Sequence, residues 1–378
     1  SEAAEGGSDD YDDSGDSGDS GAIDGGALRA ALLQSALQLG DPLSGGFGQQ
    51  TRFPKAPQLA ALLELLADAR DAGRAEAELA DLLRLTLDQM AGQGLADHLA
   101  GGFFRYTIDP GWQVPHFEKM LYTQALLVPV YLRAAVVLDR PQHLAIARTT
   151  LDFMLSTMTA PNGLMIASLS AVDAEGIEGG YYLWDAAELA RVLTPSQRAV
   201  AALVWGLAGV PDQDGGLLPR RRAAPAAVAE RHRFDVAAIE HDLDAARAAL
   251  LSERRHRSLP RDHKTLAGWN GLALSALVVG ARAFPDARYR AAASRLRDAL
   301  VSTFLGDDGL VRSPAWNDEA AAPIEATVAD YAYVAAGLAD WAELADMPAD
   351  RALARDLARG AFQRFRRDGL WHREATPL

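Results

Sequence analysis

The sequence predicts an all-α protein, and three observations lead to that expectation. From residue 27 onward, apolar residues recur at spacings of three and four, the period of a helix with one buried face. The alternation of apolar and polar residues that marks a half-buried strand is almost absent. Hydrophobic residues make up 49% of the 378 residues, which is enough to bury a large core.

The expected helices follow one another closely, and most are separated by short Gly, Pro or Asp breaks. They span residues 27–39, 58–70, 75–91, 116–138, 142–158, 195–207, 236–256, 268–284, 286–304, 327–344 and 349–366. Stripes such as Leu59, Leu62 and Leu66 are too apolar to face water, so consecutive helices should pack as antiparallel hairpins. Because no repeat of fixed length is found, we prefer a ring of hairpins, an α/α toroid, over an open solenoid.

The chain opens with an acidic segment that differs from the rest. Residues 1–24 hold nine acids and no base, so the formal net charge of −14 leaves about −5 (−14 plus 9) for residues 25–378. A Gly, Ser and Asp run of this kind buries too little apolar surface to offset its ordering entropy. We therefore expect a disordered acidic linker over 1–24 and a single toroid domain over 25–378. This charge balance also argues against nucleic acid as a partner, because nucleic-acid binding requires concentrated positive charge.

Several kinds of chemistry are excluded or disfavoured by what the sequence lacks. It has no cysteine, which excludes disulfides, thiolate metal ligands and thiol nucleophiles within this chain. No HExxH string, phosphate loop or GxSxG elbow is present, so we expect no metal and no cofactor. Neither a membrane span nor a signal peptide is legible, and the expected compartment is the cytoplasm.

The first group of candidate site residues follows Pro115, which suits the first position of a helix. His116 and Glu118 would then lie at the positive end of the helix, and Tyr122 would share a face with Glu118. These three side chains could act as acid, base and hydrogen-bond partner. The alternative is that Glu118 only offsets the helix dipole and His116 only closes a loop.

A second group lies in the irregular stretch 92–114, since long loops in a helical scaffold often carry function. Glycines there allow close approach of a ligand, and aromatic faces with a forked guanidinium suit a polar ring-shaped ligand. The candidates are His98, Arg105, Tyr106 and Trp112. The alternative is that Arg105 pairs with Asp109 or with the backbone and only holds the loop.

A third group surrounds the expected helix at 268–284. Asp262, His263 and Lys264 form a charged loop before it, and Trp269 and Asn270 open it. An Asp and His pair can tune a proton-transfer group near neutral pH.

A further acid, Asp330, lies with Tyr333 on one face of the expected helix at 327–344. Tyr331 belongs to the apolar stripe of the same helix, so it is expected in the core.

Five unusual strings occur in a fixed order along roughly 290 residues. They are GGFGQQTRFPKAP (45–57), HLAGGFFRYTIDPGWQVPHFEKMLY (98–122), EGIEGGYYLW (175–184), LPRDHKTLAGWNGLALSAL (259–277) and VADYAYVAAGL (328–338). On these strings the chain resembles the thioredoxin domain-containing protein family of the spermatogenesis-associated protein 20 type. The resemblance covers the helical region and not the thioredoxin-like domain. It implies a six-hairpin toroid like those of N-acylglucosamine 2-epimerases and several glycosidases, which we expect to be incomplete at the C-terminal side.

The family resemblance leaves two function classes open. One is an enzyme acting on a sugar-like substrate by general acid and base chemistry, with His116, Glu118, Asp262 and Asp330 as catalytic candidates. The other is a non-catalytic module that serves a thioredoxin-like partner in trans. The retained HFEKM and WNG strings favour the enzyme. The changed strings YTQA, where the family usually has YDNA, and DHK, where it usually has DDK, favour the module.

Overall fold

The structure, a computed structural model, describes residues 24–74, 76–211, 215–306, 309–314 and 324–375. The expected linker lies outside these residues except for Asp24. The Asp24 side chain accepts a hydrogen bond from the Gly26 amide and caps the first helix, α1 (Gly25–Leu39).

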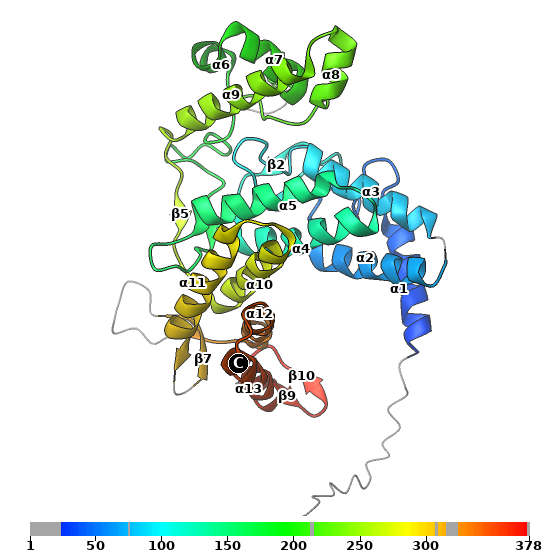
Figure 1. The fold of residues 1–378 in the computed structure, drawn as a ribbon, viewed down its shortest axis with the longest axis vertical. Helices are drawn as coiled ribbons and strands as arrows, with labels where there is room; N and C mark the ends of the chain where they lie inside the picture. The colour runs from blue at the N-terminus through cyan, green and yellow to red at the C-terminus, as the bar shows by residue number, and fades with distance from the viewer. Residues whose placement is uncertain (1–23, 75, 212–214, 307–308, 315–323, 376–378) are drawn as a thin grey trace, which may run out of the picture.

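Four helical hairpins form an arc (Figure 1). Their first helices pack side by side in chain order and make the inner row: α2 (Ala56–Asp71), α4 (Leu121–Val137), α10 (Ala267–Ala283) and α12 (Val328–Ala345). Their second helices each pack on the preceding one: α3 (Ala77–Gly92), α5 (Gln142–Phe153), α11 (Ala287–Phe304) and α13 (Pro348–Phe365). An α/α toroid places its helices in the same alternation, so the predicted fold class is confirmed.

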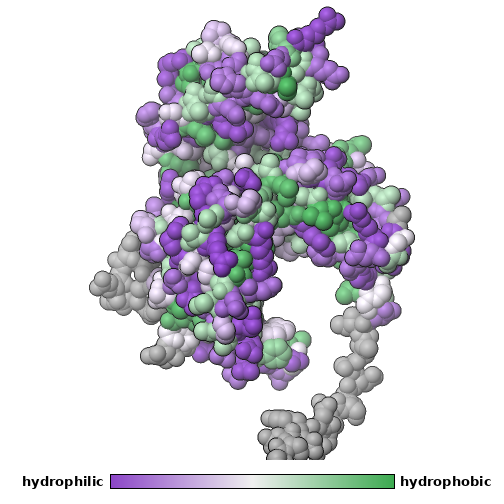
Figure 2. All heavy atoms as spheres, viewed as in Figure 1, coloured by the Kyte–Doolittle hydropathy of each residue, from purple (hydrophilic) through white to green (hydrophobic). Residues whose placement is uncertain are grey.

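The ring is open among the described residues. No packing interface joins α12 and α13 at one end of the arc to α1, α2 and α3 at the other. Figure 2 shows the gap between these two ends in the space-filling view. This agrees with the expectation of an incomplete toroid.

The remaining helices form a second packed unit beside the arc (Figure 1). They are α6 (Ala186–Val192), α7 (Pro195–Trp205), α8 (Pro225–His232) and α9 (Val236–Arg254). Their apolar side chains make a core of their own, centred on α7 and α9 and including Trp184 and Trp205. The sequence predicted two of these helices but placed them within the toroid, and it missed the short helices α6 and α8.

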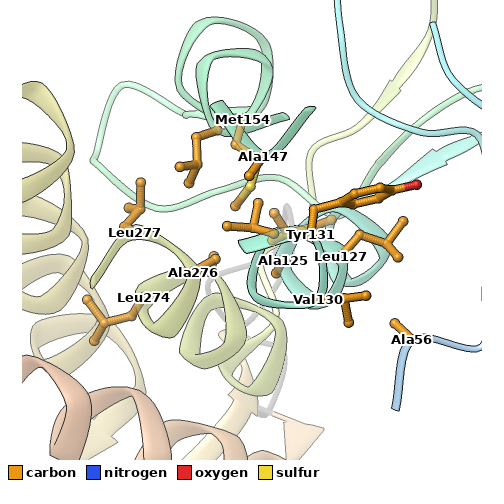
Figure 3. Packing of buried hydrophobic residues seen from close by; sticks show 14 of the residues in the cluster. Ala56, Ala125, Leu127, Val130, Tyr131, Ala147, Met154, Leu274, Ala276 and Leu277 are labelled. Carbon is orange, nitrogen blue, oxygen red and sulfur yellow. The ribbon is translucent and has the colours of Figure 1, made fainter. Parts of the chain in front are cut away.

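The main core lies between the inner and outer rows of the arc. Figure 3 shows part of it, with labelled side chains of α4 such as Tyr131, of α10 such as Leu277, and Met154, which begins a π-helical turn (Met154–Met158) after α5. Tyr331 of α12 is a core residue, as expected, and so is Tyr131 of α4.

Short strands lie between the helices and position the loops. The pairs are β1 (Tyr106–Thr107) with β2 (Pro115–His116) and β9 (Arg366–Arg367) with β10 (Leu370–Trp371). The three-stranded sheets are β3 (Lys119–Met120), β4 (Ser168–Leu169) and β5 (Arg261–Asp262), and β6 (Leu305–Gly306), β7 (Gly309–Ser313) and β8 (Ile324–Glu325).

One predicted boundary is wrong at the point that matters most for the site. We expected a helix from 116, with Pro115 at its first position, but β2 and β3 occupy this segment and α4 begins at Leu121. Pro115 takes part in a strand pair with Thr107 instead. The tertiary pairing with β1 and β4 overrides the local preference, because it places Phe117 and Lys119 in buried positions.

No helix among the described residues is long and apolar enough to cross a membrane.

Candidate functional site

The first turns of the four inner helices meet at one end of the arc, and we call this end the mouth. Lys55 and Ala56 at the start of α2 share a cavity with Tyr122 in the first turn of α4. Tyr122 contacts Trp269 of α10, with ring centroids 5.0 Å apart. Next to Trp269, the amide of Gly268 donates to Asp330 of α12. The positive ends of the four helix dipoles therefore lie at the mouth.

Arg105 links two other residues of the mouth. Its Nη1 donates to Oε2 of Glu118 at 2.9 Å, and its guanidinium also interacts with the Tyr122 side chain. Burial would lower the pKa of Arg105, but these two partners raise it above its ordinary value. Arg105 pairs with Glu118 and not with Asp109, whose carboxylate accepts from the backbone amides of Gly111, Gln113 and Val114.

His116 lies between two carboxylates. Its Nδ1 is 2.8 Å from Oε1 of Glu178, and its Nε2 is 3.8 Å from Oε2 of Glu118. Its ring stacks on Tyr106 at 5.0 Å between centroids, because His116 and Tyr106 are directly opposite each other in the β1–β2 pair. An imidazole flanked by carboxylates and partly open to solvent can accept or donate a proton.

The aromatic surface continues beyond Tyr106. Phe53 stacks on the other side of that ring, with centroids 4.7 Å apart, and is exposed. The isolated bridge between Arg52 and Thr107 places Phe53 there. The three rings form a row that we call the aromatic platform: Phe53, Tyr106 and His116.

Asp262 and Lys264 lie near the mouth but pair with each other. Their ion pair joins Lys264 Nζ to Asp262 Oδ2 at 3.5 Å, with both side chains exposed. In the register of the sheet, Asp262 is opposite Ser168, which is opposite Met120. Two strand spacings separate Asp262 from β3, or about 9.5 Å, so the structure does not bring it into contact with His116 or Glu118.

Two predicted site residues are held in the interior by the fold. Trp112 is completely buried and donates its indole N–H to the Ser44 carbonyl. Asn270 is also completely buried. Its side-chain oxygen accepts from the Met165 amide, and its side-chain nitrogen donates to the carbonyls of Met165 and Leu266. Neither offers a free polar group to a ligand in this arrangement.

Asp330 has a similar role at the start of α12. Its carboxylate closes a capping box with Thr327 and accepts further hydrogen bonds from Gly268 and Arg312. With its side chain 5% exposed, Asp330 holds α10 and α12 together.

His98 lies in a different place, a cleft of about 310 Å³ between the arc and α9. Its Nε2 is 3.1 Å from the Gln93 carbonyl. Burial, together with the charge of Arg221, lowers the pKa of His98 to about 4, so its ring is neutral near pH 7. It does not share a cavity with the residues of the mouth.

A buried ionic cluster lies directly behind the mouth. Lys119 of β3 and Arg254 of α9 each contact Oδ2 of Asp97 at 2.8 Å, and all three side chains are buried. Burial would raise the pKa of Asp97, but the charges of Arg254 and Lys119 lower it far below 3.8. Burial lowers the pKa of Lys119 to about 8, against the opposing effect of Asp97. This cluster anchors β3, and with it Glu118, to the second unit.

Sequence reasoning missed several residues of the site. Glu178 lies in the EGIEGGYYLW string, but no local pattern says that it reaches His116, 62 residues away. Phe53 and Lys55 lie in the GGFGQQTRFPKAP string. The only signal in the sequence was an aromatic and a cation within that string, and the structure shows that both side chains are exposed. Among the described residues, no group of His, Asp and Glu side chains is arranged to hold a metal ion.

Comparison with known proteins agrees with the resemblance in the motifs. Human spermatogenesis-associated protein 20 is 29% identical over 346 residues, which cover 78% of this chain and 42% of that protein. The chain is homologous to the spermatogenesis-associated protein 20 family. The uncharacterised protein B0495.5 of Caenorhabditis elegans is 27% identical over 297 residues, 72% of this chain and 40% of that protein. The chain thus spans about two fifths of the length of each of these two relatives.

No protein-family model matches the chain. Among solved structures, a sugar epimerase from a ruminal bacterium shows a weak similarity, with a TM-score of 0.41 and 12% identity. The match covers 91% of this chain and 87% of the epimerase.

Proposed function

We propose that the mouth binds a sugar-like, polyhydroxylated ligand and that His116 and Glu118 act on it as a general acid and base pair. The observation that carries the proposal is the placement of His116. Its imidazole lies between the carboxylates of Glu178 and Glu118 and at the end of an aromatic platform. Proton-transfer groups and a ring-binding surface therefore meet in one place.

Each part of the mouth has a distinct task in this proposal. The faces of Phe53 and Tyr106 pack on the apolar face of a sugar ring. Arg105 and Tyr122 line the same cavity and offer donors to hydroxyl groups. Arg105 also fixes the Glu118 carboxylate, so that one oxygen stays near His116.

A thermal-shift screen of mono- and disaccharides tests the proposal, because a ligand that binds only the folded state raises the unfolding midpoint. We expect a stabilising sugar to lose its effect in His116→Ala. The variant should unfold within about 0.5 kcal/mol of the parent, since His116 lies at the surface of the mouth.

The matched control is His241→Ala, which removes an exposed histidine on α9 and should keep the response to the sugar. If no sugar stabilises the protein, or if His116→Ala responds as the parent does, the proposal is wrong.

A further inference from the structure

A cavity of about 240 Å³ opens beside the aromatic platform, between the start of α2 and the first turn of α4. Phe53 and Tyr122 supply aromatic walls, and Leu126 and Leu127 supply apolar ones. Two cations, Arg105 and Lys55, line the same cavity. The cavity is therefore continuous with the mouth and shares Arg105 and Tyr122 with it.

The charges around this cavity do not cancel. Glu118 neutralises Arg105 through their ion pair. Lys55 has no ion pair among the residues that the structure describes, and no Asp or Glu lines the cavity. One positive charge is left, and it lies beside a partly enclosed apolar surface where a counter-charge would be screened less than in open water.

The backbone adds to this positive charge. Lys55 is the cap residue of α2 and provides no side-chain cap, and Pro57 follows in the first turn. The amides of Ala56 and Gln58 belong to the first turn and have no partner within the helix. The dipole of a 16-residue helix thus points its positive end at the cavity that Lys55 and Arg105 line.

We infer that the ligand of the mouth is acidic: a sugar ring that carries a carboxylate, as in a hexuronic acid, with the carboxylate beside Lys55 and the ring on the aromatic platform. This inference rests on the proposed function and adds the charge of the ligand to it. The hydroxyl groups alone would leave Lys55 without a counter-charge, whereas a carboxylate matches both the ammonium group and the free helix amides.

The test compares pairs of ligands that differ in one group, the hexoses and the matching hexuronates, by isothermal titration at constant ionic strength. We expect the hexuronate of the best pair to bind about threefold to fivefold more tightly than its hexose, the gain of one favourable charge contact with an exposed cation. Lys55→Met should abolish this preference, so that the hexuronate and its hexose bind with equal affinity to the variant. Both side chains are unbranched at Cβ, so the left-handed backbone at φ 47° is equally acceptable to each.

Two further variants complete the test. Lys55→Arg should restore the preference, and Arg70→Met, which removes an exposed cation at the other end of α2, should keep it. If hexoses bind as tightly as hexuronates, or if the preference survives in Lys55→Met, the inference is overturned while the proposed function stands. If no member of the panel binds, both are overturned.

Discussion

At the scale of single residues, the motifs mix two kinds of side chain. In the string HFEKM, His116 and Glu118 face the mouth, whereas Phe117 and Lys119 are buried behind it. Alternation along an extended segment explains the division, because successive side chains of a strand point to opposite faces. The extended backbone therefore places His116 and Glu118 in the mouth and Phe117 and Lys119 in the buried region behind it.

The buried cluster of Asp97, Lys119 and Arg254 should contribute strongly to the free energy of unfolding of the protein. Asp97→Asn leaves two buried cations without their counter-charge, which we expect to lower the free energy of unfolding by about 3–5 kcal/mol. Urea denaturation measures this difference. The matched control is Asp68→Asn, which breaks the exposed pair with Arg29 and should cost no more than about 1 kcal/mol.

The difference in free energy of unfolding between the parent and Asp97→Asn should also depend on pH, which gives a second test of this variant. The pKa of Asp97 is lower in the folded protein than its ordinary value of 3.8, so the folded state binds fewer protons there. Its stabilisation is fully present above about pH 4 and is lost as the pH falls further. The parent and Asp97→Asn should therefore converge in acid. Equal stability of the two at neutral pH would contradict the role of the cluster.

Sequence reasoning identified part of the site at this scale. Arg105, Tyr106, His116, Glu118, Tyr122 and Trp269 were predicted, and the structure brings them into mutual contact. Trp112 and Asn270 lie in the same strings but hold the backbone of other segments. Hydrogen-bond partners distinguish the two groups. Those partners, such as Met165 for Asn270 across 105 residues, are set by tertiary contacts that local sequence does not reveal.

At the scale of elements, helix periodicity predicted most helices well because each has a broad apolar face. The two-residue strands β2 and β3 escaped prediction, since a segment so short has no period to detect. The sheet of β3, β4 and β5 nonetheless joins three loops. Its strand β3 comes directly before α4, and its strand β5 comes before α10.

The packing of α10 on α12 depends on glycine. A Cβ at Gly271 would lie 2.5 Å from the Tyr333 carbonyl oxygen, and a Cβ at the facing Gly337 would lie 2.5 Å from the Gly271 carbonyl oxygen. The two backbones thus touch, which explains why this is the most extensive helix contact of the arc.

We expect Gly271→Ala to push α10 and α12 apart and to lower the free energy of unfolding by about 1–3 kcal/mol. The matched control is Gly92→Ala at the end of α3, where a Cβ meets nothing within 4 Å. That substitution should be neutral or slightly stabilising, because alanine is the better helix former. Urea denaturation of the two variants measures the contrast. Equal midpoints for Gly271→Ala and the parent would refute the close approach of the backbones.

At the scale of the whole molecule, the arc gathers four helix starts at one mouth and leaves the opposite ends of the inner helices away from it. The all-α class and the hairpin order were predictable from the sequence, because helix length and short breaks fix both. The separation of α6 to α9 as a second unit was not, since its helices have the same periodicity as the others. What sets that unit apart is its own core around Trp184 and Trp205.

The second unit still reaches the mouth through Arg254, the last residue of α9. Arg254 joins Asp97 and, through it, Lys119 beside Glu118. The position of Glu118 therefore depends on contacts that span 157 residues of the chain.

The most direct test of ligand binding at His116 is nuclear magnetic resonance of the histidine side chains during a titration with the best-stabilising sugar. The chain has 8 histidines, and the His116 signal is assigned by its loss in His116→Ala. We predict that the sugar shifts the His116 imidazole signals in a saturable way and leaves those of His241 on α9 unchanged. A sugar that binds with His116 unshifted would contradict the assignment of the mouth as the ligand site.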